Sequence, residues 1–480
     1  MKIQLNICLM LLGISILLSC TVKRAVVNPP VSNQSSDPAP QKFAIKPDFP
    51  DFELEFKKIL EQHSADLSYP EVIEAFYQLH KLQPVLVRRF MAEGQLDTLL
   101  SRLEESAEHG LDPELFFTAG LKKMKNRLSN KKAGNVLSKY RDTVELELNV
   151  ASSLLKYSNA LQFGLTDPLK IYKEYFAETA RPDSTFMMQV LEHKELKGYL
   201  DSIQPKSGQY LALQAALKAQ VQAQEKTISQ TGELLKLNLE RLRWKNRPPG
   251  LKYVRVNIAD FSLDVIDKGK LVLRMKVCVG EAARQTPQLS SMIYSVQVNP
   301  VWNIPESIAR NEIIKYASRD KYYLANNSIN VFKNGKRVWD LEAIDWGKAE
   351  PGSYSFKQRP GMKNSLGKIK FLFKNESSVY LHDTPVKSAF NQKNRAISHG
   401  CVRVEKPLEL AFVLFGKGPK YDQVKNAMQS GYPREKYIGL PTAIPISIAY
   451  YTALADQQGK VIFNKDIYGL DDMLAEELKK

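Results

Sequence analysis

The chain has 480 residues, of which 44% are hydrophobic and 25% are charged, and its formal net charge is +16. This balance excludes an intrinsically disordered chain and a collagen-like repeat. At roughly 100–200 residues per domain, the length allows two to four domains. Four cysteines are too few for a disulfide scaffold. The positive charge suits an anionic neighbour, such as nucleic acid, a membrane surface or an acidic polymer, without choosing among them.

The amino terminus predicts export. A short basic start is followed by a mainly apolar stretch over residues 7–18, which is too short to cross a bilayer and typical of a signal peptide. The stretch ends in Leu17-Leu18-Ser19-Cys20, which resembles the bacterial lipobox, in which the cut precedes a cysteine that is then lipidated. We therefore expect a lipoprotein signal peptide over 1–19 and a lipid on Cys20. An ordinary signal peptide with a chance cysteine is the alternative.

Residues 21–50 carry six prolines and little apolar periodicity, which predicts a lipid-anchored flexible tether over 20–50. Thr21 follows the cysteine, with no acidic residue there, and this favours the outer membrane with the protein facing the periplasm. The predicted localisation is therefore the bacterial cell envelope, with a membrane contact through the amino-terminal lipid.

Residues 51–244 follow a helical pattern. Leu96, Leu99, Leu100 and Leu103 form one apolar stripe that Gly110 ends, and two more helical stretches follow, over 143–163 and from residue 210 onward with a break at Gly232. The histidines of this half lack metal-ligand spacing, and no catalytic cluster occurs in it. We predict a helical scaffold domain.

After residue 247 the apolar period changes from helical to two, and several short strands follow, which predicts a mainly β domain over 245–480. The fold class is therefore α+β. Residues 306–352 form an insertion with a helical start and a hairpin across Asn334-Gly335, and we interpret this insertion as a lid over the site.

The candidate chemistry lies between residues 380 and 403, in Tyr380-Leu381-His382-Asp383 and Ser398-His399-Gly400-Cys401-Val402-Arg403. A cysteine needs a base or a positive pocket to react as a thiolate at neutral pH, and two histidines lie within twenty residues of Cys401. Gly400 permits a sharp turn that exposes the sulfur and lets main-chain N–H groups face a developing oxyanion. Cys278, on a predicted strand, is expected to be a free thiol, although a disulfide to Cys401 is possible in an oxidising compartment.

Other site classes lack their motifs. No glycine-rich phosphate loop, CxxC pair or acidic metal loop is present, so we predict no cofactor and no metal. Nucleic acid is not an expected partner, because the basic residues are dispersed and the chain is exported.

Together these motifs resemble the L,D-transpeptidases, particularly the large subgroup with a helical scaffold before the catalytic domain. The residues that carry the resemblance are Asn238-Leu239-Glu240-Arg241-Leu242-Arg243-Trp244, Asn299-Pro300-Val301-Trp302-Asn303-Ile304-Pro305, Gln358-Arg359-Pro360-Gly361, Asn364-Ser365-Leu366-Gly367 and the segments around His382 and Cys401. The small peptidoglycan-binding helical module usual in the subgroup looks absent or vestigial before Asn238.

The resemblance implies a cysteine acyltransferase of cell wall biogenesis. Cys401 would attack a donor tetrapeptide stem of peptidoglycan, release D-alanine, and pass the acyl group to the side-chain amine of an acceptor stem as a 3→3 cross-link. His382 would be the base, oriented by the main-chain carbonyl of Asp383, while Tyr380 and the Cys401 N–H would stabilise the oxyanion. The implied substrate-binding residues are Ser398, His399, Gly400, Arg403 and Trp302, and carbapenem-type inhibitors are expected to react with the thiol.

Two alternatives stay open at this point. The same thioester could be resolved by water, which would make the protein an L,D-carboxypeptidase, and the choice depends on how well the acceptor pocket excludes water. A non-catalytic peptidoglycan-binding lipoprotein is the other alternative, although such a protein would not need the cysteine and histidine set.

Overall fold

The computed structural model describes residues 52–91, 94–130, 135–222, 229–244, 250–350 and 352–480. The expected signal peptide, Cys20 and the tether lie outside the described residues. Within them, no helix has the length and apolar character needed to cross a bilayer.

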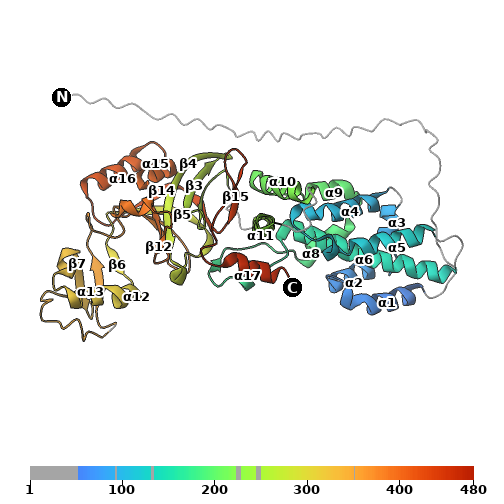
Figure 1. The fold of residues 1–480 in the computed structure, drawn as a ribbon, viewed down its shortest axis with the longest axis horizontal. Helices are drawn as coiled ribbons and strands as arrows, with labels where there is room; N and C mark the ends of the chain where they lie inside the picture. The colour runs from blue at the N-terminus through green and yellow to red at the C-terminus, as the bar shows by residue number, and fades with distance from the viewer. Residues whose placement is uncertain (1–51, 92–93, 131–134, 223–228, 245–249, 351) are drawn as a thin grey trace, which may run out of the picture. The chain divides into compact units, whose positions relative to one another are not determined.

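The amino-terminal half is a helical domain built around one long central helix, α6 (Val136–Phe163), most of whose side chains are buried (Figure 1). Gly164 ends α6, as the sequence predicts. The helices that share the apolar core of α6 are α1 (Phe52–His63), α2 (Pro70–Leu79), α3 (Val85–Met91), α4 (Gln95–Glu104), α5 (Thr118–Asn130), α8 (Ser184–Glu192) and α9 (Leu196–Ser202). The short helix α7 (Pro168–Ile171) follows α6, and α10 (Gly208–Gln222) packs against α11 (Gln230–Arg243) in a separate core.

Two details of this half differ from the prediction. The break before α11 precedes Gly232, which lies in the first turn of the helix, where its N–H donates to the Oγ of Ser229 over 3.2 Å. The helical half also contributes a strand, β1 (Tyr175–Phe176), which pairs with β5 (Gln288–Val298) of the following domain. Two strand residues are too few to show a period in the sequence.

The carboxyl-terminal half is a mainly β domain, so the predicted α+β class is confirmed. Its strands follow the order β5-β10-β11-β13-β4-β3-β2-β14, and β14 also pairs with β5, which closes the sheet into a barrel (Figure 1). The strands are β2 (Lys252–Asn257), β3 (Ser262–Asp267), β4 (Lys270–Gly280), β10 (Ile369–Phe373), β11 (Leu381–His382), β13 (Val402–Val404) and β14 (Lys436–Ala449); β12 (Ala396–Ser398) pairs with β4 outside this path.

Alternating side chains of the barrel fill its apolar core, which α15 (Pro407–Phe415) and α16 (Pro419–Ser430) help to cover. A small hairpin, β15 (Ala453–Ala455) with β16 (Val461–Phe463), and helix α17 (Leu470–Glu477) end the chain.

The insertion between β5 and β10 is a subdomain with its own core. Its four-stranded sheet has the order β6-β9-β7-β8, from β6 (Trp302–Ile304), β7 (Ile329–Lys333), β8 (Lys336–Val338) and β9 (Ser355–Gln358). Helices α12 (Glu306–Ile308), α13 (Ile314–Arg319) and α14 (Tyr323–Asn326) accompany it, with a π-helical turn over Ala309–Ile313. Because β6 and β9 belong to this sheet, the subdomain extends on both sides of the predicted 306–352.

A buried polar network joins α11 to the end of the chain. Arg241 is 1% exposed, and its Nη1 lies 2.5 Å from the Oδ1 of Asp471 on α17. Its Nη2 also donates to the hydroxyl of Tyr172 and to the carbonyl oxygen of Leu470. Asn238, one turn earlier, exchanges hydrogen bonds with Thr452 over 2.9 and 3.0 Å. Through these contacts the segment Asn238–Trp244 links the helical domain to the carboxyl-terminal half of the chain.

Candidate active site

Strand register gathers the candidate residues on one face of the barrel wall. β11 and β13 run parallel, with Leu381 opposite Val402 and His382 opposite Arg403. Leu381, Val402 and Val404 point into the barrel core. Since side chains alternate along a strand, Tyr380, His382, Cys401 and Arg403 share the other face. Lys370 lies on the same face, because β10 pairs with β11 and Lys370 is directly opposite His382.

His382 is held by its neighbour's main chain. The side chain is 5% exposed, and its Nδ1 donates to the carbonyl oxygen of Asp383 over 2.6 Å. In this tautomer Nε2 carries the lone pair that can accept a proton. Burial and the positive charge of Arg403 lower the pKa of His382 to about 4, so the ring is neutral at neutral pH.

The carboxylate of Asp383 faces other partners. One oxygen accepts from the main-chain N–H of Lys368 over 2.9 Å, and the other pairs with the Nζ of Lys387 over 2.6 Å. Asp383 therefore reaches His382 through its carbonyl and not through its side chain, which is the arrangement that the resemblance implied.

Cys401 lies beside Tyr380, is partly exposed and forms no disulfide. Burial raises the pKa of its thiol, while hydrogen bonds from the main chain and hydroxyl of Tyr380 and the charges of Lys370 and Arg403 act in the opposite direction. The Nζ of Lys370 also lies 4.9 Å from the centre of the Tyr380 ring. A thiol in this environment rests in the protonated form and needs a base when it attacks.

Hydrogen bonds within the loop brace the chain just before Cys401. Ser398 donates through its Oγ to the carbonyl oxygen of Cys401 over 2.6 Å and accepts from the N–H of Gly400 over 3.2 Å. Gly400 has a φ of +109°, a region that side-chain-bearing residues rarely adopt. This glycine is the reason that the chain can turn sharply just before the nucleophile.

Sequence reasoning missed two residues that brace this loop from behind. Thr286 is 2% exposed, and its Oγ1 donates to the carbonyl oxygen of Gly400 over 2.8 Å and accepts from the N–H of Gly280. The hydroxyl of Tyr468 accepts from the N–H of Thr286 over 3.2 Å and lies 2.5 Å from the carbonyl oxygen of Gly280. No motif marks either residue, because each lies more than 60 positions from Cys401.

His399 connects the site to the insertion. Its Nε2 lies 2.5 Å from the Oε1 of Glu312, in the π-helical turn, and the same oxygen lies 3.5 Å from the Nη1 of Arg284. The insertion thus contacts the loop two residues before Cys401, as a lid would.

Two other residues of the sequence analysis lie in apolar surroundings. Trp302, in β6, is half-buried and packs against the core of the insertion, and its role in substrate binding stays a prediction. Cys278 is a free thiol, as predicted, but it is fully buried with Ala389 and Phe390. In the described part of the chain, no three His, Cys, Asp or Glu side chains gather as a metal site.

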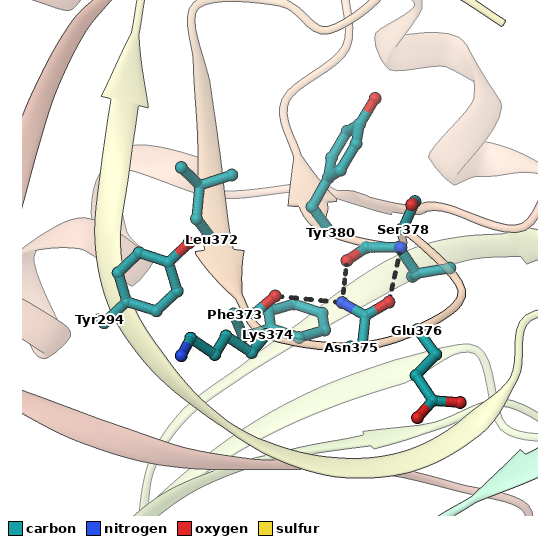
Figure 2. Close-up of a pocket in the computed structure, with 9 residues that line it drawn as sticks. Tyr294, Leu372, Phe373, Lys374, Asn375, Glu376, Ser378 and Tyr380 are labelled. Carbon is teal, nitrogen blue, oxygen red and sulfur yellow. Dashed lines mark hydrogen bonds between the residues drawn. The ribbon is translucent and has the colours of Figure 1, made fainter.

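A groove of about 620 Å³ begins at Tyr380 and follows the turn between β10 and β11 (Figure 2). Tyr294 lies across from this turn, and Lys374 and Glu376 lie on opposite sides of Asn375. The amide of Asn375 donates to the carbonyl oxygens of Phe373 and Val379 and accepts from the N–H of Val379. These hydrogen bonds brace the turn, and Tyr380 is the residue that the groove shares with the candidate site.

Comparison with known proteins gives two family matches. Residues 251–414 match the YkuD family, described as the L,D-transpeptidase catalytic domain, and residues 71–217 match the family described as the scaffold domain. A protein of Haemophilus influenzae, named provisionally as an L,D-transpeptidase, is 30% identical over 305 residues, which are 63% of this chain and 61% of that protein. The chain thus spans about three fifths of the length of this relative.

Solved structures give weaker similarities. An L,D-transpeptidase from Mycobacterium smegmatis has 13% identity and a TM-score of 0.21, with 42% of this chain and 58% of that chain covered. L,D-transpeptidase 1 from Mycobacterium tuberculosis has 12% identity and a TM-score of 0.17, with 42% and 61% covered. An L,D-transpeptidase in complex with imipenem has 14% identity and a TM-score of 0.21, with 42% and 59% covered.

Proposed function

Because the chain combines an L,D-transpeptidase catalytic domain with a scaffold domain, we propose that it forms 3→3 cross-links between peptidoglycan stem peptides through a thioester on Cys401. The observation that carries the proposal is the shared face of β11 and β13. It holds the thiol, the Tyr380 hydroxyl and a neutral His382 whose Nδ1 is engaged by the Asp383 carbonyl.

In the acylation step, the sulfur of Cys401 attacks the carbonyl carbon of the third residue of a donor tetrapeptide. The thiol proton passes to Nε2 of His382, and the Asp383 carbonyl stabilises the imidazolium that forms. The oxyanion accepts hydrogen bonds from the Tyr380 hydroxyl and the Cys401 N–H. The peptide C–N bond then breaks, His382 returns the proton to the leaving nitrogen, and D-alanine departs.

In the second step, a stem amine attacks the thioester carbonyl. The neutral ring of His382 takes a proton from that nitrogen, the C–S bond breaks, and the sulfur leaves and recovers the proton. The product is an amide between two third residues, and the enzyme returns to its resting state. If water attacks in place of the amine, the products are a tripeptide stem and the free enzyme.

The groove beside Tyr380 supports the transfer to an amine. Glu312 of the insertion contacts His399, two residues before the thiol, whereas the groove is lined by Tyr380 and the turn after β10, and we propose that donor and acceptor use these two different approaches. Lys374 and Glu376 offer one positive and one negative partner, which suits an acceptor stem that carries both carboxylates and an amine (Figure 2).

Incubation of the purified protein with tetrapeptide-bearing muropeptides, followed by mass spectrometry, tests the proposal. We expect cross-linked dimers and released D-alanine, and no product with Cys401→Ala. Tripeptides without dimers would show an L,D-carboxypeptidase instead. Absence of both products, with Cys401 still reactive toward a small thiol reagent, would exclude the activity on this substrate.

We also propose that Cys20 is lipidated and that the protein is anchored in the outer membrane facing the periplasm. The support is the Leu17-Leu18-Ser19-Cys20 sequence followed by Thr21 and the proline-rich stretch. Wild-type protein should partition into membranes and Cys20→Ala should not. A wild type recovered wholly in the soluble fraction would contradict the anchor.

A further inference from the structure

The insertion has a sheet face that its own helices do not cover. Ile329, Val331 and Phe356 point from the sheet into the core of the insertion, where Ile308 and Leu324 also pack. The opposite side chains of the same strands form the outer face, which the register defines as Asn303, Asn330, Phe332, Arg337, Ser355 and Lys357, and Trp339 joins it through its contact with Arg337. Except for Asn330 and Phe332, which are half-buried, these residues are exposed.

The centre of this outer face is an indole braced by a cation. Trp339, directly after β8, is 76% exposed, and the guanidinium carbon of Arg337 lies 3.8 Å from the centre of its ring. The Nη2 of Arg337 donates to the Oδ1 of Asn330 over 2.9 Å, which fixes the guanidinium plane. One side of the indole is therefore occupied by Arg337, and the exposure leaves the rest of the ring open for stacking.

The remaining groups suit a polymer with hydroxyls and carboxylates. The amides of Asn303 and Asn330 both donate and accept hydrogen bonds. Arg337 and Lys357 are exposed cations, the second with its Nζ 5.2 Å from the centre of the Phe332 ring. None of the seven residues is Asp or Glu, so an anionic ligand meets no carboxylate on this face.

We propose that this outer face binds a cell-wall glycan strand with its peptide carboxylates, at a distance from the reacting stem. A pyranose ring would stack on Trp339 and carboxylates would pair with Arg337 and Lys357. The inference rests on the proposed function, because it assigns a second contact with the same polymer. Glu312 of the same insertion contacts His399, two residues before Cys401. A glycan strand bound to the outer face is therefore held by the subdomain that contacts the nucleophile loop.

Co-sedimentation of the full-length protein with purified insoluble peptidoglycan tests the proposal, in a Cys401→Ala background so that the polymer is not modified. We expect Trp339→Ala to weaken binding about tenfold, the effect of removing one aromatic anchor. Arg337→Ala should weaken binding and also reduce its salt dependence. Tyr322→Ala is the matched control, because Tyr322 is a 54% exposed aromatic of the same insertion with a lysine over its ring, but outside this face.

Activity on soluble muropeptides separates this inference from the proposed function. With Cys401 present, Trp339→Ala should process soluble muropeptides at the wild-type rate, since Trp339 is not on the face of β11 and β13 that holds His382 and Cys401. Equal binding of insoluble peptidoglycan by Trp339→Ala and Tyr322→Ala would overturn the inference, as would competition by polyglutamate as strong as that by soluble peptidoglycan fragments. If binding depends on Trp339 but the wild type processes no muropeptide, the glycan-binding role of the outer face is supported and the proposed activity is excluded.

Discussion

Glu312 and His399 lie 2.5 Å apart, carboxylate oxygen to Nε2, although 87 positions separate them in the chain. Glu312 belongs to the insertion, and His399 belongs to the loop that presents Cys401. Arg284 approaches the same carboxylate oxygen at 3.5 Å. One carboxylate of the insertion thus contacts two segments of the catalytic half of the chain: the loop that contains His399 and the turn that contains Arg284.

Glu312→Gln should weaken closure of the insertion over the site. Partly exposed ion pairs contribute about 0.2–1 kcal/mol, so we expect KM for a donor stem to rise by a factor of roughly 1.5–5 with little change in labelling of Cys401 by iodoacetamide. Glu306→Gln, which removes an exposed pair with Arg310 in the same insertion, is the control. Equal losses in labelling and in KM would point instead to a disturbed loop.

Thr286→Val should slow catalysis by loosening the loop before Cys401. The change leaves the Gly400 carbonyl and the Gly280 N–H without their hydroxyl partner in a buried site, at a cost of about 1–3 kcal/mol. We expect kcat to fall more than KM changes, and Thr286→Ser to restore kcat because it keeps the hydroxyl. A valine variant with wild-type kcat would show that this brace is not needed.

The stability of the protein should fall in acid partly because of His382. Its pKa is lowered from 6.5 to about 4, so the unfolded chain binds a proton that the folded chain excludes. The stabilising contribution is complete above pH 6.5 and is lost as the pH falls toward 4, by at most roughly 3 kcal/mol. Urea unfolding between pH 7 and 4 should therefore show a smaller loss for His382→Gln than for wild type. An identical loss for both, with His63→Gln as the control histidine change, would contradict the assignment.

A carbapenem should acylate the sulfur of Cys401, because the β-lactam carbonyl replaces the stem carbonyl in the acylation step. We expect an adduct by intact-protein mass spectrometry on wild type and on Cys278→Ala, and none on Cys401→Ala or Cys401→Ser. His382→Ala should react about 10²–10⁴ times more slowly. His399→Ala should be impaired through the loop and its contact with Glu312. An adduct on Cys401→Ala, or full-rate acylation of His382→Ala, would overturn the mechanism.

Arg241→Met should destabilise the chain strongly. Removal of one partner from a buried ion pair leaves the Asp471 carboxylate uncompensated and costs about 3–5 kcal/mol. Arg127→Met is the control, because Arg127 is 45% exposed and its pairs with Asp142 and Glu145 should contribute about 1 kcal/mol or less. Chemical unfolding measures the free energy of unfolding of both variants. Equal losses would show that the buried pair of Arg241 and Asp471 contributes little to the stability.

The sequence by itself determined the features that depend on short separations. The change of apolar period near residue 247 predicted where helices give way to strands, because a strand and a helix bury different spacings of side chains. Spacing put two histidines, His382 and His399, within twenty positions of Cys401 as candidate bases, and the resemblance to the L,D-transpeptidases singled out His382. The resemblance implied that Asp383 acts through its main-chain carbonyl, and strand alternation agreed with this, since neighbours on a strand face opposite sides.

Tertiary structure alone decided the contacts between distant segments. Register between β11 and β13 decided that Tyr380, His382 and Cys401 share a face, and packing brought Thr286 to Gly400, Glu312 to His399 and Tyr175 to the edge of β5. It also decided that Trp346 is buried in the insertion while Trp339 is exposed. The physical reason is that each contact joins residues whose proximity depends on how whole elements pack, and no local pattern of side chains encodes that arrangement.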